Sequence, residues 1–415
     1  MAAATTYATP ALRARRGDAQ ALAQALLESR LDTLRTFGAY EAALPGLAVP
    51  QAEEFNPPLW ELGHIGWFAS WWIARNPQRD RGWRADPQAP RAPAPRTDTD
   101  ELYDSTRVAH ATRWSLPLPD ARATRADLAS QLEHTLGLLA STAPATADSL
   151  YFFRLALLHE DMHHEAALYM AQALGVPIDD ARWQAPSLPD PGPPLSLPAG
   201  RVALGADADD EAFAFDNECG RLEAGHTAIS IDRQALRWME FLPFVEAGGY
   251  EQAQWWTAAG WQWRLAQATR AKREPAAPRY LRREAGGWQQ WRHGQWQALD
   301  LRAPACHLSC HEAQAWCRWA GRRLPTETEW VAALRAAGDA FRWGDVWEWT
   351  ASAFAPYPGF QPHPYREYSA PWFDGRPVLR GASFMTQARM RHSDYRNFFS
   401  AQRNDLAAGL RTCAA

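Results

Sequence analysis

Two histidines four residues apart carry the strongest chemical signal in this sequence. They are His159 and His163, in the segment LLHEDMHHE at residues 157–165. The apolar residues around them recur with helical spacing, so both imidazoles project from the same face of a helix. Because that face is otherwise apolar, we expect the histidines to point into the protein interior. Such a pair can bind one metal ion; a buried, hydrogen-bonded pair without a metal is the alternative.

A third imidazole lies upstream in a similar setting. His64 interrupts another apolar helical face in LWELGHIGWF, residues 59–68. Three neutral imidazoles suit Fe(II), Zn or Cu and leave coordination positions open for dioxygen and a substrate, but ligand type alone does not choose the metal. Glu160 and Glu165 are either acceptors for imidazole N–H groups or solvated helix residues. We expect His164 to face away from the site.

The same segment contains HExxH, the motif in which zinc peptidases use the glutamate as a general base. A hydrolase is therefore a second possibility. The downstream histidines that would complete such a site are His226, His293 and His307, which all follow a proline-rich stretch. The HxxGxxH extension is also missing. His64 is the better third ligand, and the zinc peptidase is the less favoured alternative.

Two further patterns carry weaker signals. CHLSCH at residues 306–311 looks like a metal or haem motif, but its spacing is CxxxCH, and we favour a structural role. Residues 77–96 contain five prolines and five arginines, which excludes a regular element. These arginines could meet an anionic substrate, but a solvated surface loop is the favoured interpretation.

Composition narrows the class of protein. The chain has 415 residues, which favours two domains, and its 47% apolar and 22% charged residues are typical of a soluble protein. A net charge of -4 gives no electrostatic case for a nucleic-acid partner. No stretch approaches the roughly 18 apolar residues of a membrane span, and the N-terminus lacks a secretory core. The five cysteines contain no CxxC pair, so a reducing cytoplasm fits and a disulfide framework does not.

Helices must position the histidines. Apolar spacing, caps and breakers predict four of them, which suggests a bundle. The expected helices are residues 18–37, stopping at Gly38; 57–76, with Asn56 as N-cap and Pro57 at the first helical position; 124–141; and 149–174, closed by Gly175.

A proline-dense stretch separates this region from the rest. We predict a helical domain at residues 1–176, a linker at 177–198 and a second domain at 199–415, which makes the chain an α+β protein. The second domain is expected to contain short strands, loops and two brief helices. Capping boxes mark the starts of these helices, and glycines mark their ends: Ser309 with Glu312, Thr326 with Glu329, then Gly321 and Gly338.

At these residues the chain resembles the ergothioneine-biosynthesis sulfoxide synthases over nearly its whole length. These iron enzymes join an N-terminal DinB-like four-helix bundle to a C-terminal mixed domain of the formylglycine-generating-enzyme, C-type-lectin-like type. The resemblance implies that His64, His159 and His163 bind Fe(II), with no other cofactor. It also implies that the cleft between the domains binds hercynine, the trimethylated betaine of histidine. The motifs are LWELGHIGWF, HEDMHHE, FDNE, GGY, GRRLPTETEW, GDVWEWTAS, PYPGF, VLRGASF, YRNFF and GLR.

Departures from the family pattern affect what the resemblance implies. Formylglycine-generating enzymes need a cysteine pair in the C-terminal core, whereas here only Cys413 lies beyond Cys317, so that oxidase activity is not expected. The family commonly has a glutamine before its last ligand histidine, in contact with the substrate imidazole. This chain has Met162 there, which changes how hercynine would be oriented.

A second departure concerns the other substrate. Members that use gamma-glutamylcysteine read Arg-Asn-Trp-Asp where this chain has Arg396, Asn397, Phe398 and Phe399. The acidic group for the donor's ammonium is gone, while Asn397 and Arg403 stay in register. Leaving a buried ammonium unpaired would be costly, so a neutral donor is favoured.

With the segment at residues 102–120, these changes resemble the selenoneine synthases, which use a selenosugar donor. Thiol transfer from gamma-glutamylcysteine or cysteine is the alternative, and a non-catalytic betaine-binding protein is a third possibility. Hercynine, the donor and dioxygen are the expected partners, with no nucleic acid and no membrane.

Family members also use a tyrosine near the iron as a proton donor. Tyr365 and Tyr368 are the candidates for this role, which requires hydrogen-bond reach of the reduced oxygen. Phe398 is a candidate for cation–π contact with the trimethylammonium group. For Trp347 and Trp349 a core position is favoured.

Overall fold

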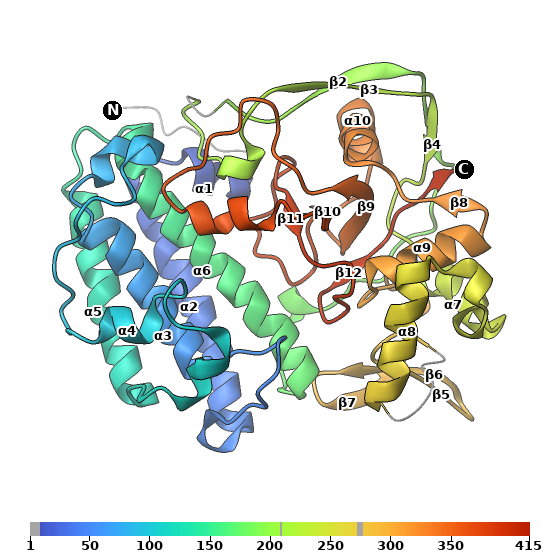
Figure 1. Cartoon of the computed structure of the whole chain (residues 1–415), viewed down its shortest axis with the longest axis horizontal. Helices are drawn as coiled ribbons and strands as arrows, with labels where there is room; N and C mark the ends of the chain where they lie inside the picture. The colour runs from blue at the N-terminus through green and yellow to red at the C-terminus, as the bar shows by residue number, and fades with distance from the viewer. Residues whose placement is uncertain (1–8, 208–209, 272–276) are drawn as a thin grey trace.

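Long helices form one side of the molecule, and short strands with short helices form the other (Figure 1). The computed structural model describes residues 9–207, 210–271 and 277–415. We call residues 10–174 the helical half and residues 195–415 the mixed half. The helical half contains α1 (Pro10–Arg16), α2 (Ala19–Ala43), α3 (Pro58–Ala69), α4 (Thr99–Tyr103), α5 (Ala121–Ala140) and α6 (Ala147–Leu174).

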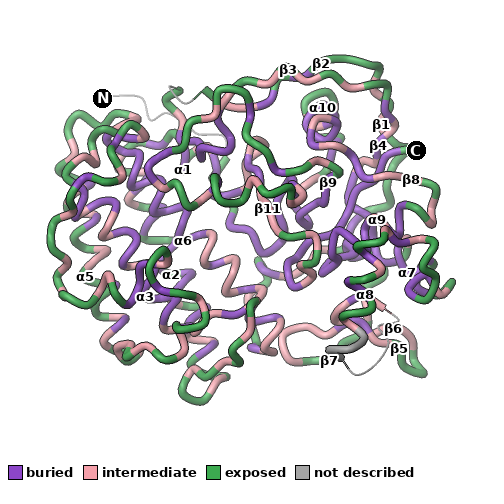
Figure 2. Tube along the Cα trace, viewed as in Figure 1, coloured by how far each residue is buried: buried purple, intermediate pink, exposed green. Residues whose placement is uncertain are grey.

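Helix α6 is the central element of the structure. A capping box between Thr146 and Ser149 begins it, and Gly175 ends it in a left-handed conformation with φ of 73°. Its side chains join one apolar cluster with residues of both halves, among them Phe152 from α6 and Phe213 from the mixed half. Buried positions therefore run through the middle of the molecule, and exposed ones lie around its periphery (Figure 2).

Several expected helix boundaries were wrong: α5 begins at Ala121, α6 begins at Ala147, and α3 ends at Ala69, where the π-helix Ser70–Ala74 follows. Helix α2 continues through Gly38 to Ala43, because Tyr40 packs on α6 and donates a hydrogen bond of 2.6 Å to the Ala167 carbonyl. This contact compensates for the low helix propensity of Gly38. Helix α3 begins one residue later than expected, with Pro57 as N-cap, since a residue before a proline disfavours helical backbone.

The described residues of the mixed half form four small sheets. Their orders are β1-β4-β13-β8, β11-β10-β9-β12, β2-β3 and β5-β6-β7. The strands are β1 (Leu195–Leu197), β2 (Gly200–Leu204), β3 (Leu222–His226), β4 (Ile229–Ile231), β5 (Leu281–Glu284), β6 (Gly287–Arg292), β7 (Gln295–Ala298), β8 (Arg322–Arg323), β9 (Trp347–Ala353), β10 (Pro377–Gly381), β11 (Asn397–Phe398), β12 (Ala408–Gly409) and β13 (Cys413–Ala414). The proline-rich stretch contributes β1 at a sheet edge, where missing N–H groups are tolerated.

Within the described part of this half, four α-helices pack beside the sheets, although only two were expected. They are α7 (Trp238–Glu246), α8 (Ala258–Ala271), α9 (Cys310–Trp319) and α10 (Glu327–Ala337). Both predicted capping boxes are present, at the starts of α9 and α10. Helix α7 was missed because it contains Pro243; the full burial of Trp238, Phe241 and Phe244 holds it in place despite that breaker.

The sheet around β9 forms the face that meets the helical half. Strand β10 pairs antiparallel with β9 and with β11, so that Leu379 lies opposite Trp349 on one side and Asn397 on the other. Trp347 at the start of β9 and Asn397 of the YRNFF segment therefore lie on opposite sides of β10. Within the described ranges, no helix has the length and apolar character that a membrane span requires.

Candidate metal centre and cleft

Three histidines converge where α3 crosses α6. His64 comes from α3, and His159 and His163 lie on successive turns of α6. Each offers one ligand nitrogen, and the three nitrogens lie within 4.8 Å of one another. His64 and His159 are 3% and 2% exposed, so the group is enclosed by protein. The structure thus brings together the three residues that the sequence predicted as ligands.

Hydrogen bonds fix the tautomers of two of these rings. His64 Nδ1 lies 2.8 Å from the Tyr103 carbonyl, which can only accept, so Nδ1 carries the proton. His163 Nδ1 lies 2.5 Å from Glu61 Oε2 and donates to that carboxylate. The Nε2 atoms of both rings are therefore unprotonated, and each carries a free lone pair. Carbonyl and carboxylate partners of this kind orient imidazoles that bind metals.

The third ring supports the fit to a metal ion. His159 Nε2 lies 3.2 Å from His163 Nε2, while its buried Nδ1 has no hydrogen-bond partner in the described part of the chain. Because His163 Nε2 is unprotonated, His159 Nε2 either donates its proton to that nitrogen or places a second lone pair against it. A metal ion bound by the three Nε2 atoms would use the converging lone pairs, so the residues present fit one.

Burial keeps His64 and His159 neutral. It lowers the pKa of His64 to about 3, with a further contribution from nearby His163, and lowers the pKa of His159 well below its usual value. For Glu61, burial alone would raise the pKa of the carboxyl, but His163, His64 and Arg113 together outweigh burial and the pKa is lowered. Neutral His64 and His159 rings near an ionised carboxylate are the protonation states that metal binding requires.

Aromatic packing holds the rings in place. Trp60 stacks on His64 with ring centroids 4.8 Å apart, and Phe68 stacks on His159 at 3.5 Å. Gly63 is also part of this arrangement, because a Cβ atom added to it would lie 2.2 Å from the Tyr103 ring. The missing side chain lets Tyr103 approach α3 and present its carbonyl to His64.

The glutamates and the last histidine of HEDMHHE do not contact the cluster. Glu160 binds Arg30 of α2 at 2.8 Å, and Glu165 binds side chains of the mixed half. The expectation that either accepts from a ligand imidazole was wrong; Glu61 does so. Glu160 is also unsuited to act as the general base of a zinc peptidase, because its carboxylate is held in that buried ion pair. His164 faces away, as predicted, and lies 2.9 Å from Thr36 Oγ1.

A cleft of about 820 Å³ lies beside the cluster, between the two halves. Met162, next to His163, forms part of its wall, and Tyr365 enters it from the mixed half with its ring centroid 6.0 Å from that of His159. The other lining residues include Arg107, His110, Arg113, Glu165, Tyr169, Trp347, Glu367, Tyr368, Trp372, Tyr395, Asn397, Phe398 and Phe399. The cleft is therefore largely aromatic, with a few charged groups.

Most of the predicted substrate residues line this cleft. Met162, Asn397, Phe398 and Phe399 all do so. Arg403 does not: its guanidinium binds Asp405 at 2.6 Å and lies 5.1 Å from the Phe399 ring centroid. The structure places it beside a cleft residue, where it can support Phe399.

The two candidate tyrosines differ in their hydrogen bonding. Tyr368 donates to the Tyr395 hydroxyl at 3.2 Å. The Tyr365 hydroxyl makes no such bond to a described residue, and burial raises its pKa above the usual value, so it keeps its proton. Tyr365 is also the one whose ring lies near His159. Geometry thus favours Tyr365 over Tyr368 as a proton donor.

The tryptophans of GDVWEW have separate positions. Trp349 is fully buried and donates to the Leu308 carbonyl, as expected for a core residue. Trp347 is only 1% exposed, yet it lines the cleft and donates to Glu165 at 2.7 Å. The core interpretation is therefore right for Trp349 and incomplete for Trp347.

The weaker sequence signals have structural explanations. His307 of CHLSCH hydrogen-bonds the Asp405 carbonyl through Nδ1 at 3.1 Å, and Cys306 and Cys310 are buried. The proline- and arginine-rich loop contains a 3-10 turn at Arg79–Arg84 that the sequence did not indicate. No arginine of that loop is among the described residues that line the cleft.

The structure also identifies functional residues that the sequence did not indicate. Glu61 and Tyr103 orient the imidazoles, but their partners lie 102 and 39 residues away in the chain. Spacing within one helix reveals contacts along that helix only. Glu61 could have been suspected as a buried acid on an apolar helix face, since such a group needs a partner.

Comparisons with known proteins agree with this arrangement. Residues 189–345 match the sulfatase-modifying factor enzyme 1-like domain. The formylglycine-generating enzyme of Streptomyces coelicolor is 30% identical over 161 residues, which cover 36% of this chain and 50% of that protein. The fold and the site therefore define a protein that combines a domain of this type with a three-histidine cluster on helices.

Longer similarities identify the family. The hercynine oxygenase of Mycolicibacterium smegmatis is 30% identical over 419 residues, which cover 86% of this chain and 90% of that protein. The hercynine oxygenase of Mycobacterium tuberculosis is 30% identical over 406 residues, with the same coverage of 86% and 90%. The chain belongs to the hercynine oxygenase family, and this membership places it among the oxygen-dependent oxidoreductases.

Proposed function

We propose that the protein is a non-haem Fe(II) enzyme that uses dioxygen to form a carbon–selenium bond between the imidazole of hercynine and a selenosugar donor. The observation that carries the metal assignment is the convergence of the His64, His159 and His163 Nε2 atoms. Family membership supports hercynine as substrate. We further propose a DinB-like bundle at residues 1–176, a linker at 177–198, the catalytic partner domain at 199–415, and a cytoplasmic location.

The cleft offers complementary groups for a betaine. Its aromatic walls suit a trimethylammonium group, which binds ring faces by cation–π interaction. Glu165 adds a carboxyl group whose Oε1 accepts three hydrogen bonds, and burial raises the pKa of this group above its usual value. Asn397 and Arg113 are available for a carboxylate. Met162 offers an imidazole only a weak acceptor and no donor, so the orientation of that ring would depend mainly on the metal and on packing.

The donor side of the cleft favours a neutral molecule. Phe398 and Phe399 line it where thiol-transferring relatives of the resembled family have an acidic residue, and Phe398 stacks on Phe354 at 4.1 Å between centroids. An ammonium group beside these rings would lack a paired carboxylate there. A sugar face, by contrast, packs well on aromatic rings. Sulfur transfer from gamma-glutamylcysteine or cysteine is the competing proposal.

The chain's own residues would control binding and protons. When bound, Fe(II) would supply the activation of dioxygen. Tyr365 would hold a proton beside the cluster, where it can be given to a reduced oxygen atom. The closed aromatic wall of Trp60, Phe68 and Trp72 would keep bulk water from the far side of the cluster. Glu61 and the Tyr103 carbonyl would keep the ligand nitrogens unprotonated.

A direct assay tests this proposal. The Fe(II) protein is incubated with hercynine, oxygen and one donor at a time: a selenosugar, gamma-glutamylcysteine or cysteine. Mass spectrometry then identifies the products. We expect a selenium-containing product of hercynine. A product formed only with a thiol donor would show that the enzyme makes a carbon–sulfur bond instead. If hercynine is not consumed with any donor, the proposal is overturned.

A further inference from the structure

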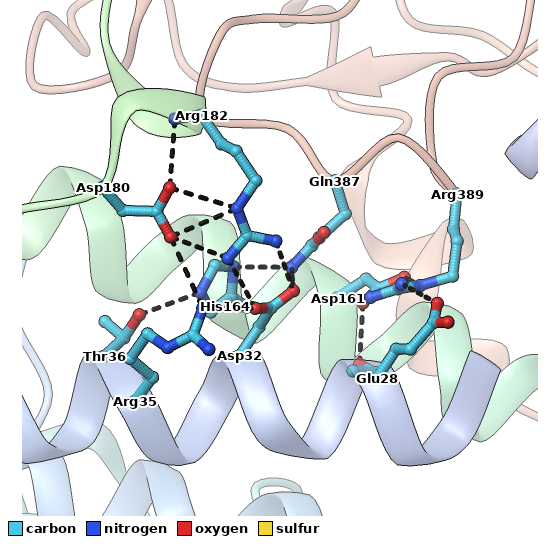
Figure 3. Close-up of polar contacts among 11 residues, drawn as sticks. Glu28, Asp32, Arg35, Thr36, Asp161, His164, Asp180, Arg182, Gln387 and Arg389 are labelled. Carbon is cyan, nitrogen blue, oxygen red and sulfur yellow. Dashed lines mark hydrogen bonds and ion pairs between the residues drawn. The ribbon is translucent and has the colours of Figure 1, made fainter. Parts of the chain in front are cut away.

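Three polar side chains of α6 lie between or directly after the ligand histidines in the sequence and are held by one segment of the mixed half. They are Asp161, His164 and Glu165, and the segment is residues 383–389. Figure 3 shows Gln387 and Arg389 of this segment reaching toward His164 and Asp161, with α2 alongside. These contacts lie on the side of α6 away from the histidine cluster.

Asp161 makes the strongest of these contacts. Its side chain is fully buried and accepts two hydrogen bonds from Arg389, from Nε at 3.0 Å and from Nη2 at 2.9 Å. Ser29 of α2 donates a third, at 2.7 Å. A bidentate pair of this kind fixes both the distance and the orientation of the two groups.

His164 is held with equal specificity one turn further along. Its Nδ1 lies 3.1 Å from the Gln387 amide nitrogen, which can only donate, so the proton is on Nε2 and is donated to Thr36. The same amide nitrogen lies 3.1 Å from Asp32 Oδ2, and Arg182 binds the other oxygen of Asp32 at 2.7 Å. Gln387 therefore connects α6, α2 and the mixed half.

Glu165 completes the set at the cleft wall. Its Oε1 accepts from Thr386 Oγ1 at 2.8 Å and from Ser383 Oγ at 3.0 Å, as well as from Trp347 Nε1 at 2.7 Å. The segment is itself braced, because the Ser383 backbone N–H donates to Thr386 Oγ1 at 2.8 Å. Segment 383–389 thus meets α6 as a preformed surface.

The polar character of the contact between segment 383–389 and α6 indicates that it positions the helix. Apolar residues often replace a buried ion pair at no loss of stability, so charge and hydrogen bonds are a poor way to gain stability alone. Directional bonds, however, set the rotation and the height of a helix. One residue of α6 corresponds to about 100° of rotation and 1.5 Å of rise, so contacts at Asp161, His164 and Glu165 determine where His159 and His163 point.

We infer that segment 383–389 is a positioning element that sets His159 and His163 relative to Tyr365, which belongs to the same half as the segment. The inference rests on the proposed function, because it takes the three histidines as metal ligands. Asp161, Gln387 and Arg389 are then positioning residues for the oxygen reaction, although none of them contacts the cluster.

Two matched double variants test the inference. Asp161→Asn with Arg389→Met removes the pair that holds the metal helix. Arg15→Met with Glu218→Gln removes another buried bidentate pair between the halves, with contacts of 2.7 and 2.8 Å, that does not touch residues 159–165. Both replace charges by neutral groups of similar size, so neither leaves an unpaired buried charge. Gln387→Leu serves as a milder variant if the first pair prevents folding.

Two measurements do not depend on turnover. The first is the visible absorption spectrum of the protein with Co(II) alone, which reports ligand geometry. The second is amide hydrogen exchange of residues 157–166 in the metal-free protein. For the Asp161/Arg389 variant we expect a changed Co(II) spectrum and at least a threefold faster amide exchange. In a separate turnover assay, this variant should consume dioxygen in excess of hercynine. The Arg15/Glu218 variant should lower Tm but keep the wild-type spectrum and exchange.

The outcomes separate this inference from the proposed function. If both variants lower Tm and leave the spectrum and the exchange of α6 unchanged, the segment is only a structural contact and the inference is overturned. If the wild-type protein does not bind Co(II), the metal proposal fails. A faster exchange confined to the Asp161/Arg389 variant would then still support a positioning contact.

Discussion

HEDMHHE and CHLSCH look alike as sequences, since both place metal-binding residue types a few positions apart, but they differ in the structure. His159 and His163 of the first motif meet His64 from a different helix, and their lone pairs converge. In the second motif, burial raises the pKa of the Cys306 and Cys310 thiols to about 12, so neither is a ready thiolate ligand. A metal site needs lone pairs that converge from separate elements, which short spacing alone does not provide.

The largest effect is expected from removing a histidine from each motif. His159→Ala should abolish metal binding and turnover, because the two remaining imidazoles are too few ligands for a stable metal site. His307→Ala should keep about one metal ion per chain and lose roughly 1–3 kcal/mol of stability by leaving the Asp405 carbonyl unpaired. Metal analysis after gel filtration and thermal unfolding measure both. Loss of metal from the His307 variant would contradict the distinction.

The next effect concerns Tyr365, whose ring lies near His159. Tyr365→Phe should lower kcat by roughly 10²- to 10⁴-fold, because it removes the proton donor while keeping the ring. KM for hercynine should stay within about twofold. Tyr368→Phe is the matched control, since its hydroxyl is engaged with Tyr395. Steady-state kinetics measures kcat for both variants. An equal loss of kcat in the two would contradict the assignment of Tyr365 as the proton donor.

A smaller change should follow from altering the carboxylate beside each motif. Glu61→Gln should weaken metal binding by about 10- to 100-fold, the usual effect of losing the partner of a ligand imidazole. Glu312→Gln next to CHLSCH is the control: it perturbs contacts to Tyr250 and Ser309 and should leave metal affinity unchanged. Competition with a chelator measures both affinities, and equal affinity of Glu61→Gln and wild type would contradict the role of Glu61.

The last effect falls on stability alone, as a pH dependence that belongs to CHLSCH. Burial lowers the pKa of His307 from 6.5 to about 4, so the unfolded chain binds a proton here before the folded protein does. Stability from this residue is full above pH 6.5 and declines as the pH falls toward 4, by up to roughly 3 kcal/mol. Urea unfolding between pH 7 and 4.5 should show a shallower decline for His307→Gln than for wild type. The exposed His134→Gln variant should follow wild type throughout.

Much of the helical half could be predicted because its signals are local. Gly175 marked the end of α6, and the apolar stripe around His159 indicated which face is buried. The structure brings the three predicted ligands together for the same reason, since each replaces an apolar residue on an inward face. Metal binding by them is still a prediction.

The features that the sequence did not predict depend on contacts between residues far apart in the chain. Pro243 signalled a break, but the burial of its neighbours against the mixed half keeps α7 helical. The bond between Glu61 and His163 joins different helices, and the bonds of Glu165 reach the other half of the molecule. No periodicity in the sequence reports such pairings, because they arise only when elements pack.

One small feature of α3 has a consequence for the whole site. Gly63 leaves room for the Tyr103 ring, and so lets the Tyr103 carbonyl reach His64 Nδ1. The proton is thereby assigned to the nitrogen that faces away from the cluster. The choice of which imidazole atom is available to a metal is thus encoded one residue earlier, by the absence of a side chain.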